Sequence, residues 1–226
     1  VGLDAVVSCV GNCRPSPTWA GFWGLHWDQE AGVTENGVVN ERIVEATYKA
    51  GGAKRFIFTT VSHDVAKALE GPLEGYIDGK RMAEDAIEAR FGKEGGLLVG
   101  PSLVYGGGRF AALGSLLAAL VTSPPAQLYL KGTLAIASVS SSTTGGLLEK
   151  VYLAPPVDVD ALARVIAAGA VGAVDPSTLP PRLQDFYNSE GKPVSYADLP
   201  LIDGTAEIKR IDGMVGREGL KRVVAA

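Results

Sequence analysis

Three short apolar runs, each closed by glycine or polar residues, alternate with amphipathic segments in the first hundred residues of this chain. The runs are 4–11, 55–61 and 95–99, and the segments between them, 36–50 and 77–91, repeat apolar residues at helical spacing. A short continuous apolar run is typical of a strand buried on both faces, and strands that alternate with helices indicate a parallel sheet. The sequence therefore predicts an α/β fold with right-handed connections.

The rest of the chain is less regular. A loop at 106–109 precedes a helix predicted over 110–121, and residues 122–150 are rich in Ser, Thr and Gly with a pair of short apolar runs. Further helices are predicted over 157–171, after two prolines, and near 216–224. Asp158 and Asp160 are typical of a helix N-cap and its first turn, and we interpret them as such and not as metal ligands.

Composition excludes several classes of protein. The 226 residues carry 21 Lys and Arg against 25 Asp and Glu, so a net charge of −4 gives no basic surface for nucleic acid. Cys9 and Cys13 lack the further ligands of a zinc site and form no disulfide framework, so we interpret them as buried or loop thiols. The most apolar stretch, 111–121, is about half of the ~20 residues that a membrane span requires. These features predict an intracellular or organellar protein without a transmembrane segment.

Tyr76 and Lys80 form a Tyr-x3-Lys pair at the start of a predicted helix. A spacing of four puts both side chains on one helical face. A nearby ammonium favours the phenolate, so Lys80 is expected to lower the pKa of Tyr76 from about 10. A tyrosine of that kind exchanges a proton with a carbonyl or alcohol. The pair therefore predicts acid–base chemistry, although Tyr-x3-Lys alone is a weak signal and also describes an exposed tyrosine packed on a lysine.

Hydroxyl side chains follow the second predicted strand. Thr60 and Ser62 lie at its carboxyl end, where open α/β sheets bind their ligands. Either hydroxyl could hold a substrate oxygen, and the sequence does not choose between them. His63 follows directly and is interpreted as a neutral loop histidine, with proton transfer as the alternative.

The order and spacing of these motifs resemble the short-chain dehydrogenase/reductase superfamily, in its extended and atypical branch. The resemblance covers roughly residues 3–170. Each matching segment corresponds to a strand, helix or loop near the cofactor in that superfamily: Asp4–Gly11, Asn36–Ala46, Lys54–Thr60, Gly75–Glu84, Leu98–Gly106 and Ala154–Asp160.

The resemblance implies a Rossmann-like, doubly wound parallel sheet whose first β-α-β portion is absent from this sequence. It implies a nucleotide-binding half over 1–107 and a small C-terminal, substrate-side region over 108–226. NAD or NADP is the implied cofactor. The implied catalytic residues are Tyr76, Lys80 and either Ser62 or Thr60, and the implied cofactor-binding residues are Val10, Gly11, Lys80, Pro101, Ser102 and Val104.

The chain departs from that pattern at several positions. No Gly-x-x-Gly-x-x-Gly loop, whose backbone amides approach a pyrophosphate, follows the first predicted strand. Gly100 and Ser102 stand where relatives carry Arg and Gly. Without preceding strands, 4–11 would form an apolar sheet edge, and such edges aggregate. We therefore expect a longer natural polypeptide, or another chain that covers this edge.

A second hypothesis follows from the same resemblance. Relatives of this branch include organellar proteins associated with coenzyme Q biosynthesis and a nucleotide-binding accessory subunit of respiratory complex I. The chain could accordingly be a non-catalytic subunit of an organellar membrane complex, in a mitochondrion or a chloroplast. Aromatic residues that could anchor such a partner, or form a local hydrophobic cap, cluster after the first run: Trp19, Trp23, His26 and Trp27.

Overall fold

The computed structural model of the chain describes residues 3–14, 16–17, 26–68, 71–106, 156–179 and 197–223. The chain divides into two compact units. The first comprises Val1–Val61, Leu69–Gly100 and Ile166–Ile202, and the second comprises Ser62–Ala68, Pro101–Val165 and Asp203–Ala226. These units interleave along the chain, and the domain boundary expected near residue 107 stays a prediction.

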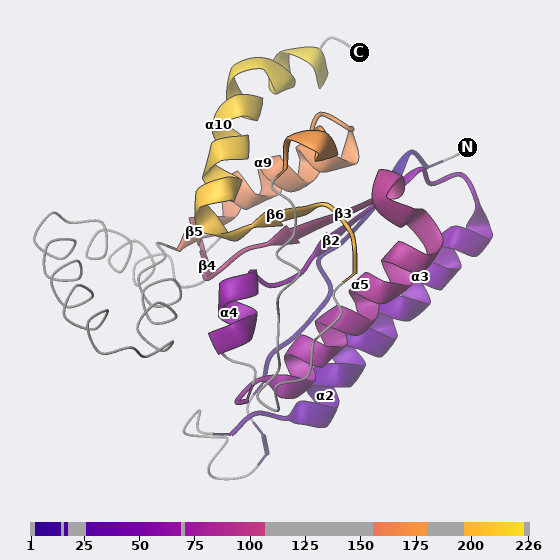
Figure 1. Cartoon of the computed structure of the whole chain (residues 1–226), viewed down its shortest axis with the longest axis vertical. Coiled ribbons are helices and arrows are strands. Elements are labelled where there is room, and N and C mark those ends of the chain that lie inside the picture. Colours follow the sequence, from indigo (N-terminus) through magenta and orange to yellow (C-terminus); the bar gives the residue numbers. More distant parts are fainter. Residues whose placement is uncertain are drawn as a thin grey trace, which may run out of the picture. The chain divides into compact units, whose positions relative to one another are not determined.

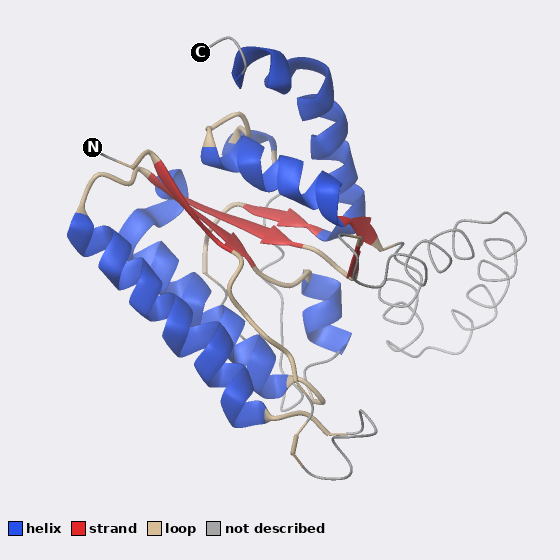
Figure 2. Cartoon of the chain, turned by 180° about the vertical axis from the view of Figure 1, so that it is seen from behind, coloured by secondary structure: helices blue, strands red, loops and turns tan. Residues whose placement is uncertain are grey.

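A parallel sheet of four strands runs through the first unit (Figure 2). Its order is β1-β2-β3-β6, and its strands are β1 (Ala5–Ser8), β2 (Arg55–Thr59), β3 (Gly96–Gly100) and β6 (Leu201–Asp203). The register pairs Val7 with Ile57 and Phe58 with Leu98. Aromatic and β-branched residues fit this pleated, buried surface well. The predicted α/β class with a parallel sheet is confirmed.

A long helical segment runs alongside a second helix in this unit (Figure 1). It consists of α2 (Gln29–Val33), a π-helical turn η1 (Thr34–Val38) and α3 (Val39–Ala50), and its partner is α5 (Glu74–Gly95). The predicted start at residue 36 is wrong, because the Asp28 carboxylate accepts a 3.0 Å hydrogen bond from the Ala31 amide and begins the helix earlier. Gly51, with φ of 69°, ends α3 as predicted.

Glycines allow these two helices to touch through their backbones. A Cβ on Gly79 of α5 would lie 2.8 Å from the Gly32 carbonyl oxygen and 2.9 Å from the Gly37 amide nitrogen. A Cβ on Gly37 would in turn lie 3.0 Å from the Gly79 Cα. Real Cβ atoms do not approach backbone this closely, so the helices could not pack at this distance with larger residues.

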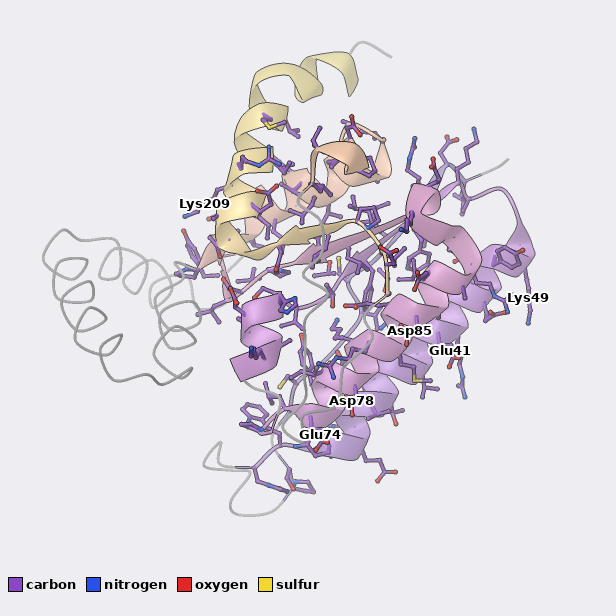
Figure 3. All side chains as sticks on the ribbon, viewed as in Figure 1. Glu41, Lys49, Glu74, Asp78, Asp85 and Lys209 are labelled. Carbon is purple, nitrogen blue, oxygen red and sulfur yellow. The ribbon has the colours of Figure 1, made fainter. Side chains whose placement is uncertain are left out.

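The core of the first unit lies between the sheet and these helices. Alternate strand residues Phe56, Phe58 and Leu98 pack with Val44 of α3 and Ile87 of α5, and all five side chains are fully buried. The opposite side of α5 is exposed and carries carboxylates (Figure 3), among them Glu74, Asp78 and Asp85. This division of polar and apolar faces is typical of an amphipathic helix on a sheet.

Shorter elements complete the described part of the chain. They are α4 (His63–Ala68), β4 (Val104–Tyr105), β5 (Val157–Asp158), α9 (Val159–Ala170), η2 (Pro176–Thr178) and α10 (Gly204–Val223). The helix predicted over 157–171 is confirmed, except that β5 occupies its first two residues. α10 is far longer than the short helix predicted near 216–224. The helix and apolar runs predicted over 110–150 lie outside the described residues.

The glycine content of α10 explains why its length was missed. Gly204, with φ of 73°, begins it, and Gly213 interrupts its apolar pattern. Thr205, Ile208 and Ile211 are nevertheless buried at a spacing of three, so one face of the helix packs inward.

Over the described stretches, none of the helices combines the length and apolar character that crossing a membrane demands.

Candidate functional site

α5 brings Tyr76 and Lys80 together at the carboxyl ends of β1 and β2. The Lys80 side chain is only 4% exposed, and its Nζ donates a 2.9 Å hydrogen bond to the Thr59 carbonyl oxygen. Nζ lies 4.6 Å from the centre of the Phe58 ring and 5.7 Å from the centre of the Tyr76 ring. The predicted pairing on one helical face is therefore present, and the buried ammonium lies close to two aromatic rings.

The loop after β1 approaches this ammonium at Gly11. A Cβ on Gly11 would lie 2.9 Å from the Lys80 Nζ and would overlap the Asn36 side-chain oxygen. Only glycine leaves this space open. Val10 and Gly11, predicted to bind cofactor, thus lie beside Lys80 in the first unit.

Two buried asparagines hold that loop in place. The Asn36 amide donates to the Asn12 carbonyl oxygen at 2.7 Å and accepts from the Asn12 amide at 3.2 Å. Asn40 donates to the Val10 carbonyl oxygen at 3.1 Å and accepts a 2.6 Å hydrogen bond from the Ser8 hydroxyl. Sequence reasoning missed both residues, although their spacing of four on an otherwise apolar helical face was a usable signal.

The Thr60 hydroxyl is already engaged by another residue. Thr60 is 3% exposed, and its Oγ1 donates to the Glu84 carboxylate, which is also buried and lies one helical turn beyond Lys80 on α5. The Thr60 amide donates to the Val99 carbonyl oxygen at 2.9 Å. A hydroxyl proton committed to a buried carboxylate does not donate to a substrate oxygen, so Thr60 is a structural residue of the site.

The predicted direction of the Tyr76 pKa shift is wrong. Burial, with a smaller contribution from the nearby Cys13, raises the pKa of Tyr76 to about 12. Desolvation of the phenolate is the larger of these two causes. Tyr76 therefore remains protonated near neutral pH, so its phenol has a proton that it can donate.

Lys80 shifts in the opposite sense for the same reason. Burial lowers the pKa of Lys80 to about 8, against the opposing charges of Glu84 and Cys9. The amine is thus still mainly protonated at pH 7 but loses its proton in mild alkali. Cys9 reaches this neighbourhood through its sulfur, which lies 3.2 Å from the Thr59 hydroxyl.

These shifts predict how stability depends on pH. Because the pKa of Lys80 is lower in the folded than in the unfolded chain, the unfolded chain binds more protons above about pH 8, and stability rises with pH there. The full window, to about 10.5, corresponds to a gain of about 3 kcal/mol. Tyr76 acts oppositely above pH 10, where stability falls. Urea unfolding of wild type and Lys80→Met at several pH values measures the free energy of unfolding as a function of pH. The same change of this free energy with pH in the two proteins would contradict the prediction.

The remaining predicted site residues belong to the second unit. Ser62 is 3% exposed, and its amide donates to the Pro101 carbonyl oxygen at 3.0 Å. The Ser102 and Thr205 hydroxyls lie 2.5 Å apart. Val104 pairs with Val157 in the two-stranded β4-β5 sheet. The structure thus brings Val10, Gly11, Thr60, Tyr76 and Lys80 together within one unit, and Ser62, Pro101, Ser102 and Val104 within the other.

The other residues for which the sequence suggested a role lie in several different environments. His63 begins α4 and does not lie in a loop as predicted, and its amide donates to the Asp203 carboxylate at 2.9 Å. Asp158 accepts from the Asp160 amide at 2.8 Å, which confirms the predicted cap. Both cysteines are exposed and free. Trp27 is half-buried, while Trp19 and Trp23 lie outside the described residues.

Comparisons with known proteins do not assign this chain to a family. No protein-family model matches the chain, and a search of curated proteins finds no match. The fold is α/β with four parallel strands, an arrangement compatible with Rossmann-like proteins. In the described part of the chain, no group of three or more His, Cys, Asp or Glu residues is arranged to hold a metal.

Proposed function

We propose that the chain is a nucleotide-binding protein of the short-chain dehydrogenase/reductase type, which reduces a carbonyl group with NADH or NADPH. The observation that carries the proposal is the position of Lys80, a buried amine held at the carboxyl ends of two neighbouring parallel strands. Open α/β sheets bind their ligands at that edge. The strand order and the Tyr76–Lys80 pair are consistent with the same class.

The donor set beside Gly11 fits one end of a pyridine nucleotide. An ammonium has three N–H donors, and the Thr59 carbonyl oxygen accepts one, which leaves donors for ribose hydroxyls. The absent side chain at Gly11 lets a ligand approach the backbone of the loop. The one Gly-x-x-Gly-x-x-Gly spacing in the sequence, Gly213 to Gly219, lies within helix α10 and not in a loop between a strand and a helix, so this fit concerns the ribose and nicotinamide end.

Tyr76 would supply the proton of the reaction. The nicotinamide, when bound, supplies the hydride. A phenol whose pKa is about 12 keeps its proton until negative charge develops on the substrate oxygen. This favours carbonyl reduction over alcohol oxidation, because the reverse direction needs Tyr76 as a base. Thr60 would not orient the substrate oxygen, because its hydroxyl proton is directed to the Glu84 carboxylate.

A second candidate is a non-catalytic accessory subunit of an organellar membrane complex. The raised pKa of Tyr76 favours it, because such a tyrosine is a poor base at neutral pH. Exposed apolar side chains at and beside the β1 strand also favour it, with Leu3 61% and Val7 42% exposed. An apolar sheet edge of this kind is suited to pairing with another chain.

Purification and a turnover assay separate the two candidates. The reductase predicts a free protein that oxidises NADH or NADPH only when a small carbonyl compound is added, followed by loss of the nicotinamide absorbance. The accessory subunit predicts stable co-purification with a large assembly and no carbonyl-dependent turnover. A free protein that neither binds nor oxidises either nucleotide would contradict the proposed reductase.

A further inference from the structure

A pocket of about 600 Å³ opens in the first unit at the end of the sheet opposite to Lys80. It lies at the amino-terminal ends of β2 and β3, where Arg55 and Leu97 line it. The end of α5 and the turn after α9 complete its wall with Lys93, Glu94 and Gly172. This volume is typical of pockets that bind small molecules. None of the residues of the proposed reductase site lines it.

Arg55 is the chemically distinctive group in this pocket. Its side chain is half-buried, and no ion pair or side-chain hydrogen bond joins it to the described residues. Its guanidinium rests against Gly172, whose φ is 72° and whose missing Cβ would lie 2.5 Å from the Arg55 Nη2. A guanidinium remains charged at all accessible pH values, and burying it without a partner is unfavourable. A planar fork of N–H donors is thus available to an anion.

The other charges around the pocket restrict what kind of anion fits. Lys93 is paired with Asp198, so Arg55 is the lining cation without an acidic partner in the described chain. The exposed carboxylates of Glu94 and Asp175 also line the pocket. Two carboxylates beside one guanidinium repel a multiply charged anion, while they accept hydrogen bonds from hydroxyl or ammonium groups.

We propose that this pocket binds a small monocarboxylic acid that also carries a hydrogen-bond donor, with its carboxylate on the guanidinium of Arg55. The planar fork of Arg55 matches the two oxygens of a carboxylate, which gives a bidentate pair. The hydroxyl or ammonium of the ligand faces the carboxylate side of the pocket. Leu97 and Val174, each 7% exposed, supply the apolar floor for a short carbon chain. The site is independent of nucleotide binding.

Lactate is a suitable probe, used at constant ionic strength. Lactate is expected to raise the melting temperature of the wild type to a plateau, and Arg55→Gln should weaken its apparent affinity at least about tenfold. Lys54→Gln is the matched control, because it removes the same charge at the neighbouring position in the chain. The Lys54 side chain is 77% exposed and does not line the pocket. It should retain the wild-type response.

Arg55→Lys and pyrophosphate provide two further tests of this pocket. Arg55→Lys keeps the charge but loses the bidentate geometry, so it should bind lactate clearly more weakly than wild type even if Arg55→Gln does not fold. Equal affinity in wild type and Arg55→Lys, or a response to lactate that never saturates, would overturn the site. A larger effect of pyrophosphate than of lactate would overturn the ligand class. NADH binding should be unchanged in Arg55→Lys, which separates this site from the proposed reductase.

Discussion

Tyr76→Phe is expected to reduce carbonyl-dependent nucleotide oxidation by about 10²- to 10⁴-fold, the range that a general acid contributes. The substitution removes one hydroxyl and keeps the ring that lies beside the Lys80 amine. Because Tyr76 donates the proton in this mechanism, the chemical step should slow while the affinity for NADH or NADPH stays within about twofold. Steady-state rates and a nucleotide titration on the same preparation measure both quantities.

Tyr48→Phe provides the matched control for this experiment. Tyr48 lies on α3, is 52% exposed and packs edge-on against Phe91, with ring centres 6.4 Å apart. It loses the same hydroxyl far from Lys80 and should keep wild-type turnover. Full activity of Tyr76→Phe would remove Tyr76 from the chemistry.

Gly79→Ala is expected to destabilise the chain by about 2 kcal/mol or more, although alanine is the better helix former by about 1 kcal/mol. The added methyl would meet the backbone of Gly32 and Gly37, which cannot move aside as a flexible side chain can. The helices must then separate, which disturbs the Asn36 contacts to the loop around Gly11. Urea unfolding measures the loss of stability.

Gly71→Ala is the control for that prediction. Gly71 lies in the turn before α5, belongs to the same unit, and has no atom within 4 Å of an added Cβ. Its replacement should be neutral or stabilise the chain by up to about 1 kcal/mol, through the unfolded state. If Gly79→Ala were as stable as Gly71→Ala, the close helix contact described for Gly32, Gly37 and Gly79 would be wrong.

Strands and long helices were predictable because their signals are local. The runs around Ile57 and Leu98 are apolar throughout, as strands buried on both faces must be. The expectation of burial on both faces is wrong for β1, where Val7 is 42% exposed, because β1 ends the described sheet. Helix ends were less predictable, since the cap at Asp28 and the glycine-rich α10 offer only weak local patterns. Secondary structure thus followed from periodicity, and its boundaries depended on single capping contacts.

The site was predictable only in part, because its electrostatics depend on burial. The spacing of Tyr76 and Lys80 showed that they share a helical face. It carried no information on the desolvation that raises the pKa of Tyr76 and lowers that of Lys80. The contact from Thr60 to Glu84 joins residues 24 positions apart in the chain, so no local pattern showed that this hydroxyl is occupied. The roles of Asn36 and Asn40 depended likewise on a distant loop.

Calorimetric titration with NADH and NADPH tests the central claim, that the Lys80 amine holds a pyridine nucleotide. The wild type should bind one of the two nucleotides at a single site, and Lys80→Met should weaken that binding at least about tenfold. Lys49→Met, which removes an exposed lysine of α3 (Figure 3), should bind as the wild type does. Equal nucleotide affinity in wild type and Lys80→Met, or no binding of either nucleotide by the wild type, would contradict the account.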